Sequence, residues 1–126
     1  MDAPASWDQS PYDLRCEWGP RGAAALAANS DVVVIVDVLS FATCVDIAVA
    51  RGAIVYPAGP GPETPAALAR RLGSRLVGPG EADYPLSAAA MLTVPAGARL
   101  VMPSLNGARL SVLTGATPTL CGCLRN

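Results

Sequence analysis

The sequence predicts an α/β fold with three layers, α/β/α, built around a mainly parallel sheet. Segments of strand composition alternate along the chain with segments that have helical spacing. The β-branched run over 31–39 shows no polar alternation, which is typical of a strand buried on both faces. Hydrophobic residues make up 52% and charged residues 15% of the 126 residues, so the chain has the composition and size of one folded domain.

The N-terminal segment predicts an arm, a strand and a helix. Residues 1–11 are polar and contain two prolines, so we expect a flexible arm that precedes the α/β domain at 12–126. Residues 12–18 alternate apolar and charged side chains, as in a half-buried strand. Pro20 suits the first turn of a short helix over 21–29.

The apolar run over 31–39 predicts the central strand of the sheet. Ser40 is a suitable N-cap for the helix that follows, whose apolar residues recur at helical spacing. Arg51 suits the last turn of this helix and Gly52 suits its C-terminal cap. The next strand is expected over 53–57.

The second half of the chain continues the same alternation, with Thr64 as an N-cap. The expected elements are a helix at 65–73, a strand at 75–78, a helical turn at 86–92, a strand at 98–103, a helix at 106–115 and a strand at 117–124. A helix normally covers the last strand of such a sheet, and none follows. We therefore expect a fold that is incomplete at the C-terminus or is covered by a partner, and a homodimer stays open.

Two absences exclude several classes of function. The chain has no His, and all nine cationic residues are Arg, which excludes Ser-His-Asp triads, His-containing zinc sites and Walker A phosphate loops. The net charge of −1, without a basic run, argues against a nucleic-acid partner. No apolar run approaches the ~20 residues of a membrane span, and the polar start is unlike a signal peptide. We therefore expect a cytoplasmic protein with reduced thiols and no membrane partner.

Polar residues near strand ends are the candidate site residues, because open α/β sheets bind ligands beyond the carboxyl ends of their strands. Asp37 lies near the end of an apolar strand and is interpreted as a metal ligand, a nucleophile or a structural acceptor for backbone amides. Ser40 and Thr43 flank the start of the next helix. Their hydroxyls can hold a phosphate together with the helix amides, or Ser40 simply caps the helix.

A second candidate segment follows the strand at 98–103. Ser104, Asn106 and Gly107 form a predicted turn, and Arg109 falls in the first turn of the next helix. A cation at this end of a helix opposes the helix dipole, and a bound anion would remove the conflict. An Asn-Gly pair by itself is an ordinary turn signal.

The remaining candidates are acidic residues in a loop and the last residues of the chain. Glu81 and Asp83 lie in a Gly- and Pro-rich loop and either bind Mg²⁺ through their oxygens or are solvated. Arg125 and Asn126 follow the last predicted strand. Acids, hydroxyls and Asn/Arg at several strand ends suit a hard cation together with a multiply anionic substrate.

Three segments together resemble the 2-phosphosulfolactate phosphatase family: VVVIVDVLSFATCVDIAVARGAIVYP, MPSLNGARL and GPGE. Asn106, Gly107 and Arg109 match the Asn-Gly motif of that family, and Glu81 matches its Gly-Glu loop. Ser40 departs from it, because an Arg usually follows Asp-Val-Leu there. The resemblance covers the N-terminal half of the family and implies an α/β/α fold, Mg²⁺ dependence and hydrolysis of a small phosphate monoester, 2-phospho-3-sulfolactate, on the route to coenzyme M.

We therefore expect a Mg²⁺-dependent phosphatase that acts on a small anionic phosphorylated substrate. Asp37 and Glu81 are the expected catalytic residues and Mg²⁺ ligands. The expected substrate-binding residues are Ser40, Thr43, Ser104, Asn106, Gly107, Arg109 and Asn126. The alternative is a catalytically incomplete fragment or pseudoenzyme that binds a small anion. A generic nucleotide-binding domain is a third hypothesis, although GxGxxG is absent.

Overall fold

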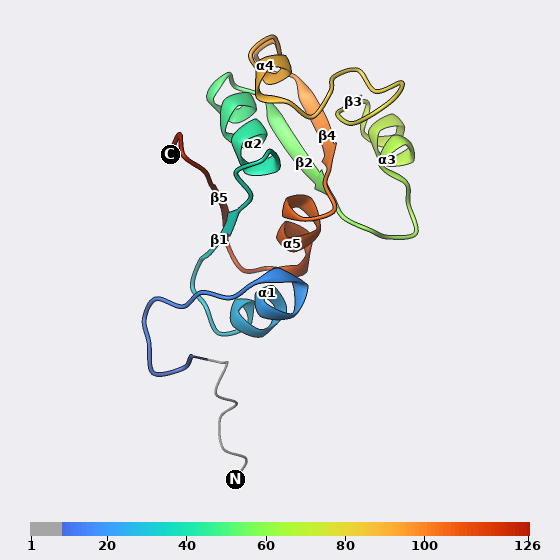
Figure 1. Ribbon diagram of the computed structural model, residues 1–126. Helices are drawn as coiled ribbons and strands as arrows, with labels where there is room; N and C mark the ends of the chain where they lie inside the picture. Colours follow the sequence, from blue (N-terminus) through green and yellow to red (C-terminus); the bar gives the residue numbers. More distant parts are fainter. Residues whose placement is uncertain (1–8) are drawn as a thin grey trace.

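The computed structural model describes residues 9–126, in which five helices alternate with five strands. The elements are α1 (Gly19–Ala27), β1 (Val33–Val36), α2 (Phe41–Ala50), β2 (Ile54–Ala58), α3 (Pro65–Leu72), β3 (Arg75–Leu76), α4 (Ala88–Met91), β4 (Arg99–Pro103), α5 (Gly107–Leu113) and β5 (Thr119–Gly122). The predicted α/β class is confirmed (Figure 1). None of these helices has the length and apolar composition needed to cross a membrane.

All the strand pairs are parallel, but the described strands form two separate hydrogen-bonded sheets. One sheet consists of β1 and β5, and the other has the order β2-β4-β3. Helix α5 follows β4 in the chain and contacts β1, β2 and β4, so it packs against strands of both sheets. Parallel pairing matches the sequence prediction, whereas the single sheet that we expected is divided.

Strand β4 lies at the centre of the hydrophobic core. Leu100 and Met102 are fully buried in one cluster with side chains from α2 and α4. Val101 points into a second cluster, which includes Ala69 of α3. Because successive side chains of a strand point to opposite faces, β4 is buried on both of its faces.

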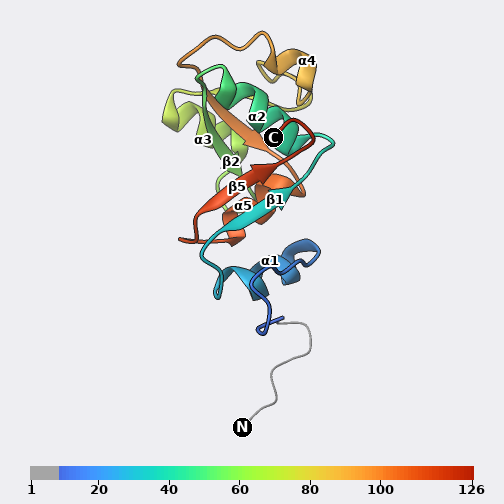
Figure 2. The ribbon, with the colours of Figure 1, turned by 90° about the vertical axis from the view of Figure 1, so that its left-hand side faces the viewer.

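The prediction of a central strand over 31–39, buried on both faces, is wrong. Strand β1 contains four residues, of which only Ile35 is buried, while Val34 is 54% and Val36 69% exposed. The strand pairs with β5 alone, and no described helix lies in front of this pair in Figure 2. An apolar run therefore identified the strand but not its place in the sheet.

The prediction of a strand over 12–18 is also wrong. Leu14 and Trp18 are more than 90% exposed, and no described strand pairs with the segment. Side chains hold it in place instead: the Gln9 amide donates to the carbonyl of Cys16 (2.8 Å) and accepts from its N–H (3.0 Å). Residues 1–8, most of the predicted flexible arm, lie outside the described residues.

Of the predicted N-caps, Thr64 makes a capping hydrogen bond and Ser40 does not. Thr64 caps α3 by accepting a hydrogen bond from the N–H of Ala67 (3.2 Å). Ser40 occupies the N-cap position of α2, but its hydroxyl donates to the carbonyl of Leu86 (3.2 Å) and makes no capping bond. Helix α2 therefore starts at the predicted place, while its cap residue ties it to the segment before α4.

Candidate functional site

Asp37 follows β1 directly and lies where β1, β5, α2 and α5 meet. Because Val36 pairs with Gly122 in a parallel register, the ends of β1 and β5 lie beside each other. Oδ2 of the partly buried Asp37 accepts a hydrogen bond from the N–H of Gly107 at 2.9 Å. This bond joins the end of β1 to the Asn-Gly turn 70 residues later in the chain.

The contact between Asp37 and the Asn-Gly turn requires glycine at position 107. A Cβ atom built there would overlap Cδ1 of Phe41 and would lie 2.7 Å from Oδ2 of Asp37. Gly107 is therefore needed for close packing. One oxygen of Asp37 acts as a structural acceptor, and its Oδ1 has no hydrogen bond within residues 9–126.

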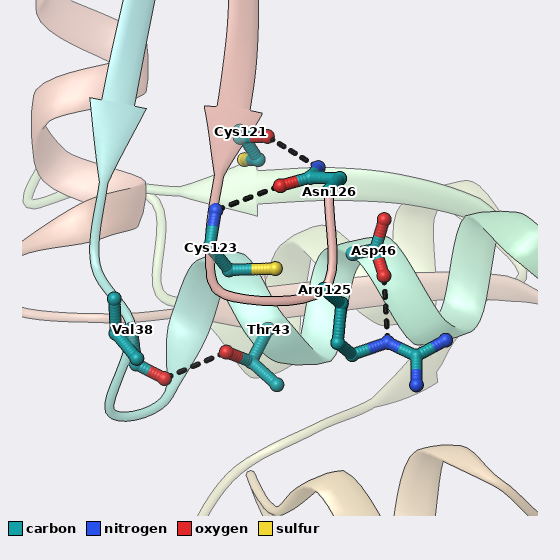
Figure 3. Close-up of polar contacts among 7 residues, drawn as sticks. All are labelled: Val38, Thr43, Asp46, Cys121, Cys123, Arg125 and Asn126. Carbon is teal, nitrogen blue, oxygen red and sulfur yellow. Dashed lines mark hydrogen bonds and ion pairs between the residues drawn. The ribbon is translucent and has the colours of Figure 1, made fainter.

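The hydroxyls of Ser40 and Thr43 are already used as donors. Thr43 donates to the carbonyl of Val38 at 2.7 Å (Figure 3), and Ser40 donates to the carbonyl of Leu86. A hydroxyl has one proton, so neither group can donate to a phosphate while these bonds hold. Both oxygens keep their acceptor capacity at the start of α2.

The Asn-Gly turn and the first turn of α5 carry exposed polar side chains. Oγ of Ser104 accepts from the N–H of Asn106 at 3.2 Å and stabilises the turn. The side chains of Asn106 and Arg109 are exposed. In the described part of the chain the guanidinium of Arg109 has no ion pair, so it can bind an external anion.

The last residues fold back over α2 as a turn. Oδ1 of Asn126 accepts from the N–H of Cys123 (2.8 Å), and its Nδ2 donates to the carbonyl of Cys121 (2.9 Å). Nε of Arg125 pairs with Oδ2 of Asp46 at 2.8 Å (Figure 3). The amide of Asn126 thus closes its own turn. Sequence reasoning missed Asp46, because an acid within a predicted helix gave no sign of a partner 79 residues away.

Glu81 lies in a different region from Asp37. It lines a cavity of about 440 Å³ between α3 and the loop after β3, and Asp37 is not part of the lining. Asp83 holds this loop, since its Oδ2 accepts from the N–H of Leu76 at 2.7 Å. The two acids that we predicted as a metal pair therefore do not line a common cavity.

The donor set at Asp37 fits Mg²⁺ in a limited way. Within residues 9–126 no group of three or more His, Cys, Asp and Glu is close enough to hold a metal ion. Magnesium commonly binds through one or two carboxylates, with waters and substrate phosphates completing the octahedron. Oδ1 of Asp37 can supply one such oxygen, so the fit depends on a phosphate ligand for the others.

Two thiols, the buried Cys44 and the partly buried Cys121, lie near Asp37. Burial raises the pKa of Cys44; the hydrogen bond with Ser40 opposes this rise, and the charge of Asp37 adds to it. Burial also raises the pKa of Cys121, with further contributions from Cys123, Asp37 and Asp46. All four cysteines are free.

We expect thiol labelling to separate Cys16 from Cys44. Cys16 is exposed and should react rapidly with a disulfide reagent at about pH 8, where an ordinary thiol is partly ionised. Cys44 is fully buried with a raised pKa, so it should react only after denaturant is added. The measurement is the release of the chromophore with time. Cys16→Ser should lower the amplitude of the fast phase, and equal rates for Cys16 and Cys44 would contradict the packing around Cys44.

Comparison with protein-family models, with curated proteins and with solved structures finds no match for this chain. The described fold defines the class, an α/β protein with parallel strands. The resemblance to the 2-phosphosulfolactate phosphatase family stays a prediction.

Proposed function

We propose that the chain takes part in the Mg²⁺-dependent hydrolysis of a small anionic phosphate monoester, as a 2-phosphosulfolactate phosphatase would. The observation that supports this is the placement of Asp37 at the adjoining ends of two parallel strands, the position where open α/β sheets bind ligands. Gly107 orients the carboxylate through one oxygen, and the other oxygen keeps no bond within the described residues.

Asp37 and Arg109 would have different roles in this reaction. Oδ1 of Asp37 would hold the metal ion, while the bond from Gly107 to Oδ2 keeps the carboxylate in one orientation. Mg²⁺, when bound, supplies positive charge against the phosphoryl oxygens. Arg109 pairs with a second anionic group of the substrate, for which a guanidinium offers two parallel donors. Glu81, which the sequence predicted as a second Mg²⁺ ligand, lines a separate cavity and has no role beside Asp37 in this proposal.

The test is the release of phosphate from small phosphate monoesters, including 2-phosphosulfolactate, with Mg²⁺ or with EDTA. Asp37→Asn keeps the size of the side chain and removes its charge, so we expect the rate to fall on the order of 100-fold. Asp31→Asn is the matched control, since Asp31 is exposed just before the same strand. Its rate should equal that of the wild type.

Two results would argue against the hydrolase. Phosphate release that persists with EDTA and in Asp37→Asn would remove both Asp37 and the metal from the mechanism. If Asp37→Asn and Asp31→Asn lowered the rate equally, the loss would come from the change in net charge and not from the position of Asp37. Glu81→Gln should lower the rate less than Asp37→Asn does, in accordance with its separate position.

A second candidate function is the binding of a small anion without turnover. It is favoured by the separation of Asp37 from Glu81 and by the engagement of the Ser40 and Thr43 hydroxyl protons within the protein. Calorimetric titration with phosphate and with a small sulfonate tests it. Binding that Arg109→Ala weakens, without any phosphate release, would favour this function over hydrolysis.

The proposal includes a cytoplasmic location. The four free cysteines support it, because thiols stay reduced in that compartment.

A further inference from the structure

A groove runs along α1 and the segment that precedes it. It has a volume of about 560 Å³, and the described residues that line it come from this one stretch of chain: Glu17, Trp18, Arg21, Gly22, Ala24 and Ala25. Trp18 is 91% exposed, and Leu14 and Tyr12 of the same segment are 92% and 67% exposed. A tryptophan in such a setting is the type of residue that anchors protein–protein interfaces.

The groove is held in shape by specific contacts. Glu17 packs over Gly22, where an added Cβ would lie 2.5 Å from the Cβ of Glu17. Oε1 of Glu17 accepts from the Gln9 amide at 3.0 Å, and Arg15 donates to Oγ of Ser30 beyond the end of α1 at 3.0 Å. The segment therefore lies folded back beside α1, at the end of the molecule opposite α4 (Figures 1 and 2).

The charges in the groove are opposite in sign and are not paired with each other. Glu17 bonds to Gln9, and Arg21 forms no ion pair in the part of the chain that the structure describes. Both side chains are exposed. A partner that carries only negative charge, such as a nucleic acid or an acidic peptide, would be attracted by Arg21 but repelled by Glu17.

We propose that this groove binds a second copy of the same chain about a two-fold axis. In such an interface a residue i contacts residue j of the other copy, and j contacts i in return. Glu17 of each copy then meets Arg21 of the other, and both charges gain a partner. The two Trp18 side chains pack between the ion pairs, over the small side chains of Ala24 and Ala25, which allow the helices to approach closely.

Charge reversal provides the test, read out by sedimentation velocity over a concentration series. Reducing agent is present because Cys16 is exposed beside the groove. The wild type should show a concentration-dependent dimer. Glu17→Arg places like charges at both contacts, as does Arg21→Glu, so each variant alone should dissociate at least tenfold more readily. A mixture of the two variants restores both ion pairs and should form heterodimers, and the double variant E17R/R21E should form homodimers again.

Dimer formation by the mixture and by the double variant can be tested even if one single variant is less stable. A wild type that stays monomeric up to about 100 μM, far above the Kd of a micromolar interface, would overturn it. So would single variants that dimerise like the wild type, or a mixture that stays monomeric. Trp18→Ala should also weaken the dimer, whereas Leu124→Ala, which removes a side chain that is 91% exposed elsewhere, should leave it unchanged.

Discussion

Phe41→Ala is expected to lower the free energy of unfolding by about 3–5 kcal/mol, the range found when a large buried ring is removed. Phe41 is the first residue of α2, and its side chain is 1% exposed. Its ring packs in the cluster that contains Met102 and Ala108, and it lies directly against Gly107. Truncation would leave a cavity at the junction of α2 and α5, next to Asp37.

Denaturant titration followed by circular dichroism measures this loss. Leu105→Ala is the control, because Leu105 is 89% exposed in the Asn-Gly turn. Its free energy of unfolding should change by no more than about 0.5 kcal/mol. Similar losses in both variants would show that the ring of Phe41 is not packed as described.

Gly107→Ala should destabilise the fold by about 3 kcal/mol, the upper part of the range for an added methyl group in a packed site. The new Cβ would overlap the ring of Phe41 and would lie 2.7 Å from Oδ2 of Asp37. The first turn of α5 would have to shift, and the hydrogen bond from position 107 to Asp37 would lengthen or break. We expect phosphate release to fall as well, because the carboxylate loses the bond that orients it.

Gly61→Ala is the matched control for Gly107→Ala. No atom lies within 4 Å of a Cβ built at Gly61, and its φ is not positive. The substitution should therefore leave stability and phosphate release unchanged, or raise stability slightly by restricting the unfolded chain. If Gly107→Ala unfolded at the same denaturant concentration as Gly61→Ala, the close contact at α5 would be refuted.

Local signals predicted most helix and strand positions. Thr64 before a proline starts α3, and Gly73 ends it with a φ of 58°. Gly52 follows α2 with a φ of 84°, a conformation that glycine adopts without strain. These signals succeed because a cap or a turn depends on residues within a few positions of one another.

From the sequence, the candidate site could be predicted only as a set of polar residues near the ends of strands. The sequence predicted Asp37 near the end of a strand and the Asn-Gly turn after another strand, and the structure joins them through the Gly107 bond. It also places Glu81 beside α3, in a cavity that Asp37 does not line. The path of each loop decides which site residues come together. That path depends on contacts such as the hydrogen bond between Asp83 and Leu76, which no sequence motif indicates.

The sequence alone determined the α/β class, the order of the elements from α1 onward and the absence of His and Lys chemistry, because composition and short-range periodicity encode them. Only the tertiary structure decided that β1 pairs with β5 alone, that 12–18 folds back along α1, and that Arg125 pairs with Asp46. The physical reason is that the type of a residue indicates only whether it favours burial or an oppositely charged partner. Which surface buries it, or which charge pairs with it, depends on segments far away in the chain that compete for the same contacts.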